Sequence, residues 1–244
     1  MDNQTDEKRP SSGRRNLLIV GGAMCFMAAW RVGAPIVGDM FSGGFETSDI
    51  PNMPGFRKIG DGSISAAGFD PFLGVDPNRI PPAPLVGTIS DNLHFEQGDG
   101  VPVAEFTDYN CPYCKILAED VHALEETGAI TLSLHHLPLL GDDSVAASRV
   151  ALSVGDPVFH RDLMSSRFRV TGDYARRLAQ DQNRNIGSMT LGDAHIGRSK
   201  ALAAKFGIIG TPALVVGRTL VIGQISAPRL SRLVEIERKD ALAA

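Results

Sequence analysis

The chain has 244 residues, a net charge of −4 and 43% hydrophobic residues, which suits a protein with one or two compact units. No cluster of basic residues occurs after residue 20, which argues against a nucleic-acid partner because phosphate binding requires clustered Lys and Arg. Only three cysteines occur, Cys25, Cys111 and Cys114, too few for a disulfide-dense secreted scaffold.

The N-terminus has the pattern of a membrane anchor. Residues 1–16 are polar with four basic side chains, and a mostly apolar stretch covers residues 17–38. That stretch reaches the length of about 20 residues that a spanning helix needs. A signal peptidase could use Val32 and Ala34, but Pro35 would follow the cut, which disfavours cleavage. We expect a cytoplasmic tail and an uncleaved transmembrane anchor, with a cleaved signal peptide as the alternative, and export of the remainder.

Cys25 lies within this stretch and is expected to be a small apolar residue of the anchor. Met24 precedes it where a lipoprotein carries a small residue, which disfavours lipidation. Residues 39–85 are rich in Gly, Pro, Asp and Ser, and their aromatic residues have no period. We expect a flexible tether over residues 39–85 that lets the folded part reach partners away from the bilayer.

A globular pattern begins at residue 86, and we predict one compact domain over residues 86–240. Val86–Ser90 and Leu93–Glu96 are predicted as two short strands, and Val101–Thr107 as a strand that ends at a turn. An apolar stripe with helical spacing follows the turn: Leu117, Val121 and Leu124. Ile130–Leu134 alternates apolar and polar residues, so this part predicts strand–helix–strand, the unit of a parallel crossover.

The rest of the domain is predicted as a helical block followed by a hairpin and a helix. Residues 142–207 are mostly helical in pattern and end at a glycine. Two strands follow, Ala213–Val216 and Thr219–Ile222, and Gly217 begins a two-residue loop typical of a type II′ turn. Ser226 is expected to cap a last helix that buries an apolar stripe: Leu230, Leu233 and Val234.

Cys111 and Cys114 have the spacing of a redox pair at the start of a helix. This spacing places both sulfur atoms on one face within disulfide range. The first cysteine also lies among unpaired backbone N–H groups at the positive end of the helix dipole, a setting that lowers thiol pKa values to about 3.5–7.5. We expect Cys111 to be the exposed attacking sulfur and Cys114 the deeper resolving one. Pro112 fits the first helical turn, and Tyr113 would flank the sulfurs.

The segment EFTDYNCPYCK, from Glu105 to Lys115, resembles the active-site segment of DsbA-like disulfide oxidoreductases, as does Gly210-Thr211-Pro212 before a hairpin. The resemblance covers roughly residues 86–238 and implies an α/β thioredoxin fold with a helical subdomain inserted at about 142–207. It further implies a cis-proline at Pro212 opposite the cysteines, with Thr211 and Pro212 holding the substrate chain by backbone pairing. Glu105 matches the acidic residue that thioredoxin-like proteins commonly carry beneath the active site, where a buried carboxyl would pass protons to the second cysteine; the alternative is that it points to solvent from an alternating strand.

Other interpretations of the cysteine pair remain open. A structural disulfide would close so short a loop that it stabilises little. A zinc site needs two more ligands, and His135 and His136 are expected to be ordinary residues at the end of a strand. Copper transfer through Cys111 and Cys114 is an alternative function, as is a holdase role in which the apolar surface around the cysteines binds unfolded chains. We predict no metal site and no cofactor.

The expected activity is thiol–disulfide exchange on exported proteins, with a Cys111–Cys114 disulfide that oxidises substrate cysteines. Disulfide isomerase or reductase activity is the alternative within the same chemistry, because Thr211 before the proline resembles the reducing and isomerising relatives. The resemblance implies a location at the bacterial inner membrane with the catalytic domain in the periplasm. It also implies a membrane redox partner, which would be a quinone-linked oxidase or an electron importer.

Overall fold

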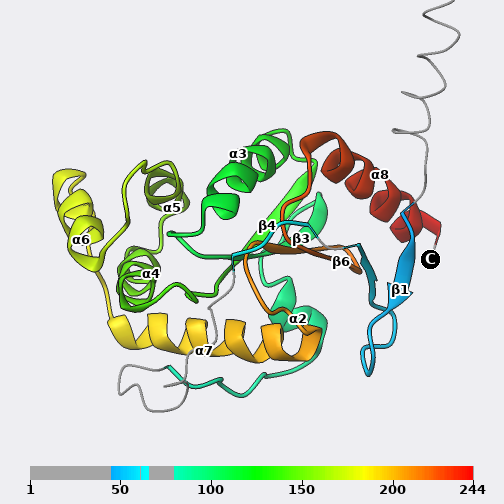
Figure 1. The fold of residues 1–244 in the computed structure, drawn as a ribbon, viewed down its shortest axis with the longest axis horizontal. Coiled ribbons are helices and arrows are strands. Elements are labelled where there is room, and N and C mark those ends of the chain that lie inside the picture. Colours follow the sequence, from blue (N-terminus) through cyan, green and yellow to red (C-terminus); the bar gives the residue numbers. More distant parts are fainter. Residues whose placement is uncertain (1–44, 61, 66–79, 244) are drawn as a thin grey trace, which may run out of the picture. The chain divides into compact units, whose positions relative to one another are not determined.

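The structure is a computed structural model that describes residues 45–60, 62–65 and 80–243 (Figure 1). Its elements are, in chain order, β1 (Thr47–Asp49), β2 (Arg57–Ile59), α2 (Ile89–Leu93), β3 (Val101–Thr107), α3 (Pro112–Glu126), β4 (Ile130–His136), α4 (Asp142–Val154), α5 (Pro157–Met164), α6 (Gly172–Asp181), α7 (Met189–Phe206), β5 (Ala213–Val216), β6 (Thr219–Ile222) and α8 (Ala227–Ala243). The predicted strand–helix–strand unit, hairpin and last helix are all present.

A six-stranded sheet with the order β1-β2-β6-β5-β3-β4 forms the centre of this unit. β3 pairs parallel with β4, because α3 carries the chain back to the end of the sheet where β3 begins. β5 follows the helices α4 to α7, enters the sheet from the end where β3 stops, and pairs antiparallel with β3. Gly217 turns the hairpin at φ +54°, a conformation that favours glycine. The last residues of β3 therefore point toward both the start of α3 and the start of β5, where the cysteine pair and Pro212 lie.

Helices cover both faces of the sheet (Figure 1). α3 and α8 pack on one face, where Leu117 and Leu230 join Val101 and Val103 in a buried cluster. α7 and α2 cover the other face, where Phe206 packs in a second cluster with residues that include Phe106. The alternation of β3 places successive residues in opposite clusters, so the strand is buried on both sides.

The predicted helical insertion is confirmed as four helices, α4 to α7, between β4 and β5. α4 and α7 each end at a glycine with positive φ, Gly155 and Gly207, as expected for helix C-termini. A third buried cluster joins this insertion to α3 through Cys114 and Ala118. The helical block therefore packs directly against the helix that carries the cysteines, and the fold is an α/β thioredoxin-like fold with a helical insert.

The tether prediction is wrong for the described residues before β3. β2 pairs parallel with β6, and Arg57 forms ion pairs of 2.7 Å with Glu237 and Asp240 of α8. Ile50 and Met53 are buried in the core. The scattered apolar residues have no helical or alternating period, because β1 buries no side chain, β2 buries one and the turn between them buries two.

The two short strands predicted over Val86–Ser90 and Leu93–Glu96 are also wrong, because the chain forms α2 there. Thr88 caps this helix and accepts a hydrogen bond from the Asp91 N–H, while the Asp91 carboxylate accepts one from the Thr88 N–H. The predicted segments 1–16 and 17–38 lie outside the described residues. Within the described part of the chain, no helix has the length and apolar character that crossing a membrane requires.

Candidate active site

Cys111 and Cys114 lie at the N-terminus of α3, where Cys111 is the N-cap residue. The Cys114 N–H donates a hydrogen bond to Cys111 Sγ over 3.2 Å, and Pro112 occupies the first turn, where an N–H would have no helical partner. Both cysteines are present as free thiols. The backbone thus supplies a donor to the first sulfur, which is the local effect expected from the position of the motif.

The pKa values of the two thiols are shifted in opposite directions. Hydrogen bonds lower the pKa of Cys111 from 9.0 to about 6, with the bond from the Cys114 thiol contributing most, while burial opposes the shift. Burial raises the pKa of Cys114 well above its usual value, and its contact with the Cys111 sulfur adds to the rise. At neutral pH the reduced pair therefore carries its negative charge on Cys111, and Cys114 holds the shared proton.

The expected exposure of Cys111 is wrong, because its side chain is 0% exposed. Two backbone segments lie against its sulfur. The thiol donates a hydrogen bond of 3.3 Å to the Thr211 carbonyl, and the Ser65 side chain lies close enough to the sulfur to lower its pKa. Ser65 lies in the stretch predicted to be a tether, and its place beside the cysteine has no signal in the sequence.

Thr211 and Pro212 lie directly opposite the cysteine pair, and the peptide bond between them is cis, as the resemblance implies. Thr211 is fully buried, and its carbonyl faces Cys111. Its backbone N–H and carbonyl are bonded to Ser65 rather than to a neighbouring strand of the sheet. The backbone edge beside the sulfurs is therefore already paired within the chain.

Glu105 is fully buried in β3, between Leu134 of β4 and Leu214 of β5. Neither of its carboxyl oxygens has a hydrogen-bond partner. Burial raises the pKa of Glu105 from 4.5 to about 7, while the nearby His122 imidazole acts in the opposite direction. A carboxyl group that titrates near neutral pH can both give and accept a proton under working conditions.

Asp108 and Asn110, which precede the motif, fix the position of the cysteines. The sequence had indicated only a turn at these residues. The Asp108 carboxylate accepts hydrogen bonds from the N–H groups of Leu139 and Leu140 and from the Ser144 hydroxyl, at 2.7–3.0 Å. The Asn110 side chain donates to the Val170 carbonyl and accepts from its N–H. These bonds join the active-site turn to the helical insertion.

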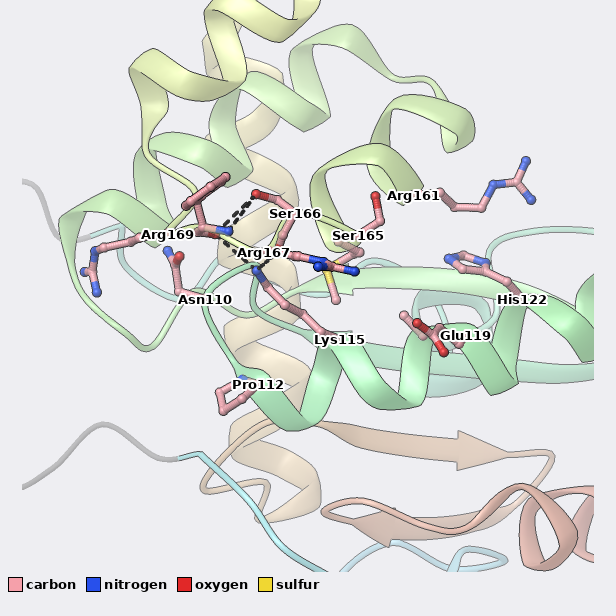
Figure 2. Close-up of a pocket in the computed structure, with 13 residues that line it drawn as sticks. Asn110, Pro112, Lys115, Glu119, His122, Arg161, Ser165, Ser166, Arg167 and Arg169 are labelled. Atoms are coloured by element: carbon pink, nitrogen blue, oxygen red, sulfur yellow. Dashed lines mark hydrogen bonds between the residues drawn. The ribbon is translucent and has the colours of Figure 1, made fainter.

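A cavity of about 610 Å³ opens beside the motif at Pro112 and Lys115. Figure 2 shows Lys115, Glu119 and His122 of α3 along one side, with the segment from Ser165 to Arg169 across from them. The Lys115 ammonium donates to the carbonyls of Ser166 and Phe168, and burial lowers its pKa. Tyr113 is partly buried and packs against the cluster that contains both cysteines. The cysteines themselves do not line this cavity.

His135 and His136 end β4, as predicted, but both are buried, and they belong to a group of aromatic rings that includes His160 and His195. His135 Nε2–H donates to the Leu93 carbonyl over 2.8 Å. Among the described residues, no three His, Cys, Asp or Glu side chains are arranged to hold a metal ion. Burial lowers the pKa of His135 and of His160 to about 3, so these rings are neutral at pH 7.

The buried histidines predict loss of stability in mild acid. The unfolded chain protonates His160 near pH 6.5, whereas the folded chain resists protonation down to about pH 3. The free energy of unfolding therefore falls as the pH drops below 6.5, by up to about 1.4 kcal/mol per pH unit for each such ring. Urea unfolding at pH 7, 6 and 5 measures this slope, and His160→Gln is expected to reduce it by about one such increment. An unchanged slope in this variant would show that His160 titrates normally.

Part of the chain is similar to a thioredoxin-domain profile and to solved thioredoxin-like structures. The profile of a DSBA-like thioredoxin domain matches residues 102–169. A thioredoxin-like oxidoreductase from Silicibacter pomeroyi DSS-3 is 31% identical, with 61% of this chain and 97% of that chain covered and a TM-score of 0.55. No curated protein gives a significant match.

Two further solved structures are similar at lower identity. A periplasmic thioredoxin-like protein from Salmonella enterica serovar Typhimurium is 26% identical, with 64% of this chain and 98% of that chain covered and a TM-score of 0.56. The catalytic domain of Proteus mirabilis ScsC is 27% identical, with 60% and 93% covered and a TM-score of 0.53. These likenesses agree with the geometry of the cysteine pair, the cis-proline and the helical insertion.

Proposed function

The chain belongs to the DsbA-like thioredoxin family of thiol–disulfide oxidoreductases, and on that basis we propose that it forms disulfide bonds in exported proteins through Cys111 and Cys114. The observation that carries the proposal is the opposite pKa shift of the two thiols, which stabilises a thiolate on Cys111 only. A stabilised thiolate favours the reduced form of the pair, and this makes its disulfide a stronger oxidant.

The reaction begins with the Cys111–Cys114 disulfide. A substrate thiolate attacks Cys111 Sγ, a bond forms between these two sulfurs, and the Cys111–Cys114 bond breaks with Cys114 as the leaving thiolate. A second substrate thiolate then attacks the substrate sulfur of this mixed disulfide and expels the Cys111 thiolate. The substrate dithiol loses two electrons to the enzyme pair. The lowered pKa of Cys111 assists the second step, because a more acidic thiol leaves faster.

Glu105 serves this cycle as a proton relay. Cys114 leaves as a thiolate in a buried position, where its negative charge is unfavourable, and the Glu105 carboxylic acid supplies the proton. When the pair is reoxidised, the carboxylate takes the proton back from the Cys114 thiol. Pro112 and Tyr113 tune the donors around the sulfurs, and Thr211 and Pro212 hold the substrate backbone.

The direction of exchange is tested by the equilibrium redox potential of the Cys111–Cys114 pair against glutathione. An oxidase is expected to give a value near that of a strong oxidant, about −120 mV, whereas a reductase gives about −270 mV. Thr211 before the cis-proline favours the second candidate, an isomerase or reductase, so a potential near the reducing end would replace oxidation as the function.

The proposed location is the periplasmic face of a bacterial inner membrane, with residues 17–38 as a single anchor. The apolar stretch after four basic residues supports this topology. The similar Salmonella protein is periplasmic, which supports the location of the catalytic domain. A membrane oxidase or electron importer would then reset the cysteine pair. Protease treatment of spheroplasts is expected to degrade the domain of the full chain while the membrane fraction retains its N-terminal segment.

A further inference from the structure

The segment Gly62–Ser65, which we call the strap, occupies the backbone edge beside the cysteines. The Ser65 N–H donates to the Thr211 carbonyl over 2.7 Å, and the Thr211 N–H donates to the Ser65 carbonyl over 2.8 Å. These two bonds form an isolated antiparallel bridge. Thr211 is the residue before the cis-proline. Because of the two bonds to Ser65, its backbone N–H and carbonyl are both already paired within the chain.

The strap also covers the attacking sulfur. Ser65 donates its N–H to the same Thr211 carbonyl that accepts from the Cys111 thiol, its side chain acts on the Cys111 sulfur closely enough to lower its pKa, and Cys111 is 0% exposed although it lies at the start of a helix. A serine differs from a cysteine by one atom, oxygen in place of sulfur. Ser65 thus holds its hydroxyl beside Cys111 Sγ where a substrate cysteine would need to place its sulfur, with its backbone paired as a substrate strand would pair.

Further contacts keep the strap in register. The Gly62 N–H donates to the Ile222 carbonyl over 2.7 Å, and the Gln224 N–H donates to the Ser63 carbonyl over 2.9 Å. Ile64 packs against the hydrophobic core and against Gly210, where an added Cβ would come within 2.9 Å of its side chain. The absence of a side chain at Gly210 therefore allows the strap to lie close to the cis-proline loop.

We propose that Gly62–Ser65 is an intramolecular pseudosubstrate that occupies the substrate-strand site and shields Cys111 until a client displaces it. This inference rests on the proposed function, because it takes Thr211 and Pro212 as the site for the client backbone. A client must replace the two Ser65–Thr211 bonds. Its apparent affinity is therefore its intrinsic affinity multiplied by the fraction of molecules in which the strap is displaced. The strap thereby favours extended clients that can form both bonds over small thiols that can form neither.

Proline at position 65 tests the shielding, because it removes the N–H that donates to Thr211. In the full chain with Cys25→Ser, Ser65→Pro is expected to raise the rate of Cys111 alkylation by iodoacetamide on the order of tenfold, since the backbone pairing is lost. The value of kcat/KM for oxidation of a dithiol peptide is expected to rise with it. Ser63→Pro is the matched control, because the Ser63 carbonyl, not its N–H, makes the described backbone bond. It is expected to leave alkylation slow.

A second experiment tests the position of Ser65 without relying on turnover. Ser65→Cys is introduced together with Cys114→Ser and Cys25→Ser, so that two thiols remain, and the reduced protein is treated with glutathione disulfide. We expect an intrachain disulfide between positions 65 and 111, with two molecules of glutathione released, and a mass 2 Da lower than that of the reduced form. Ser63→Cys in the same background is the control, because residues two apart in an extended chain are about 7 Å apart.

The outcomes separate this inference from the proposed function. Fast alkylation of the wild-type chain that Ser65→Pro does not increase, or equal crosslinking from positions 63 and 65, would overturn the pseudosubstrate. Increased alkylation in Ser65→Pro without peptide oxidation by either protein would support the strap and overturn the oxidase proposal. Unfolding curves of the proline variant are recorded alongside, and a midpoint near that of Ser63→Pro assigns the faster alkylation to the displaced strap.

Discussion

Replacement of Cys111 by serine is expected to abolish disulfide exchange, with a loss of at least about 1,000-fold in the rate of peptide oxidation. A serine hydroxyl cannot form the bond to a substrate sulfur, and Cys111 is the cysteine whose thiol donates to the Thr211 carbonyl. The measurement is oxidation of a model dithiol peptide and reduction of insulin by the purified variant. Normal activity in either assay would show that Cys111 is not the attacking sulfur.

Replacement of Cys114 gives a different result. The Cys111–Cys114 disulfide cannot form, but the Cys111 thiolate can still attack a disulfide of a client protein and expel one client thiolate, and the resulting mixed disulfide lacks the Cys114 thiol that would release it. Cys114→Ser is expected to accumulate mixed disulfides between Cys111 and client proteins, which appear on non-reducing gels and disappear on reduction. Cys25→Ser is the control for the third cysteine and is expected to give no such adducts. If Cys114→Ser formed none while Cys111 remained reactive to iodoacetamide, the order of the two sulfurs in the mechanism would be wrong.

Replacement of Glu105 by glutamine is expected to change the pH dependence of the free energy of unfolding. The unfolded chain ionises Glu105 near pH 4.5, whereas the folded chain ionises it near pH 7, so the folded state loses stability as the pH rises through this window. At pH 8 the loss amounts to about 3 kcal/mol, and it is absent at pH 4. Relative to wild type, Glu105→Gln should therefore be more stable at pH 8 than at pH 4 by about that difference. Urea unfolding of the oxidised proteins measures it without titration of the thiols.

Burying the glutamine amide changes the free energy of unfolding by the same amount at both pH values, so this effect cancels when the two values are compared. The histidines also cancel, because they contribute equally to the variant and to the wild type. Glu46→Gln, which replaces an exposed carboxylate, is the control and should change stability by a similar small amount at both pH values. The same Glu105 variant is expected to slow the release of Cys114 at neutral pH, as measured by single-turnover reduction with a peptide thiol. If the difference in free energy of unfolding between variant and wild type were the same at pH 4 and pH 8, the pKa of Glu105 would not be raised in the folded chain.

The sequence determined those parts of the fold whose signals are local. The helical period of the apolar residues placed α3, because one side chain in 3.6 must face the core, and runs of apolar residues bounded by turns placed β3 and the terminal hairpin. Gly217 marked its turn through its backbone freedom. The chemistry of Cys111 was also readable, because a helix begins immediately beside it and a helix N-terminus supplies donors whatever the rest of the fold.

Only the tertiary structure decided what lies over that cysteine. Residues of β1, β2 and the strap carry no period, since these short segments bury few side chains and pair with partners far along the chain, such as Thr211 for the strap and β6 for β2. The pKa values of Glu105 and His160 likewise follow from burial between elements that are distant in sequence. The motif thus specified the reactive group from neighbouring residues, whereas its exposure and proton supply depend on contacts that only the folded chain brings together.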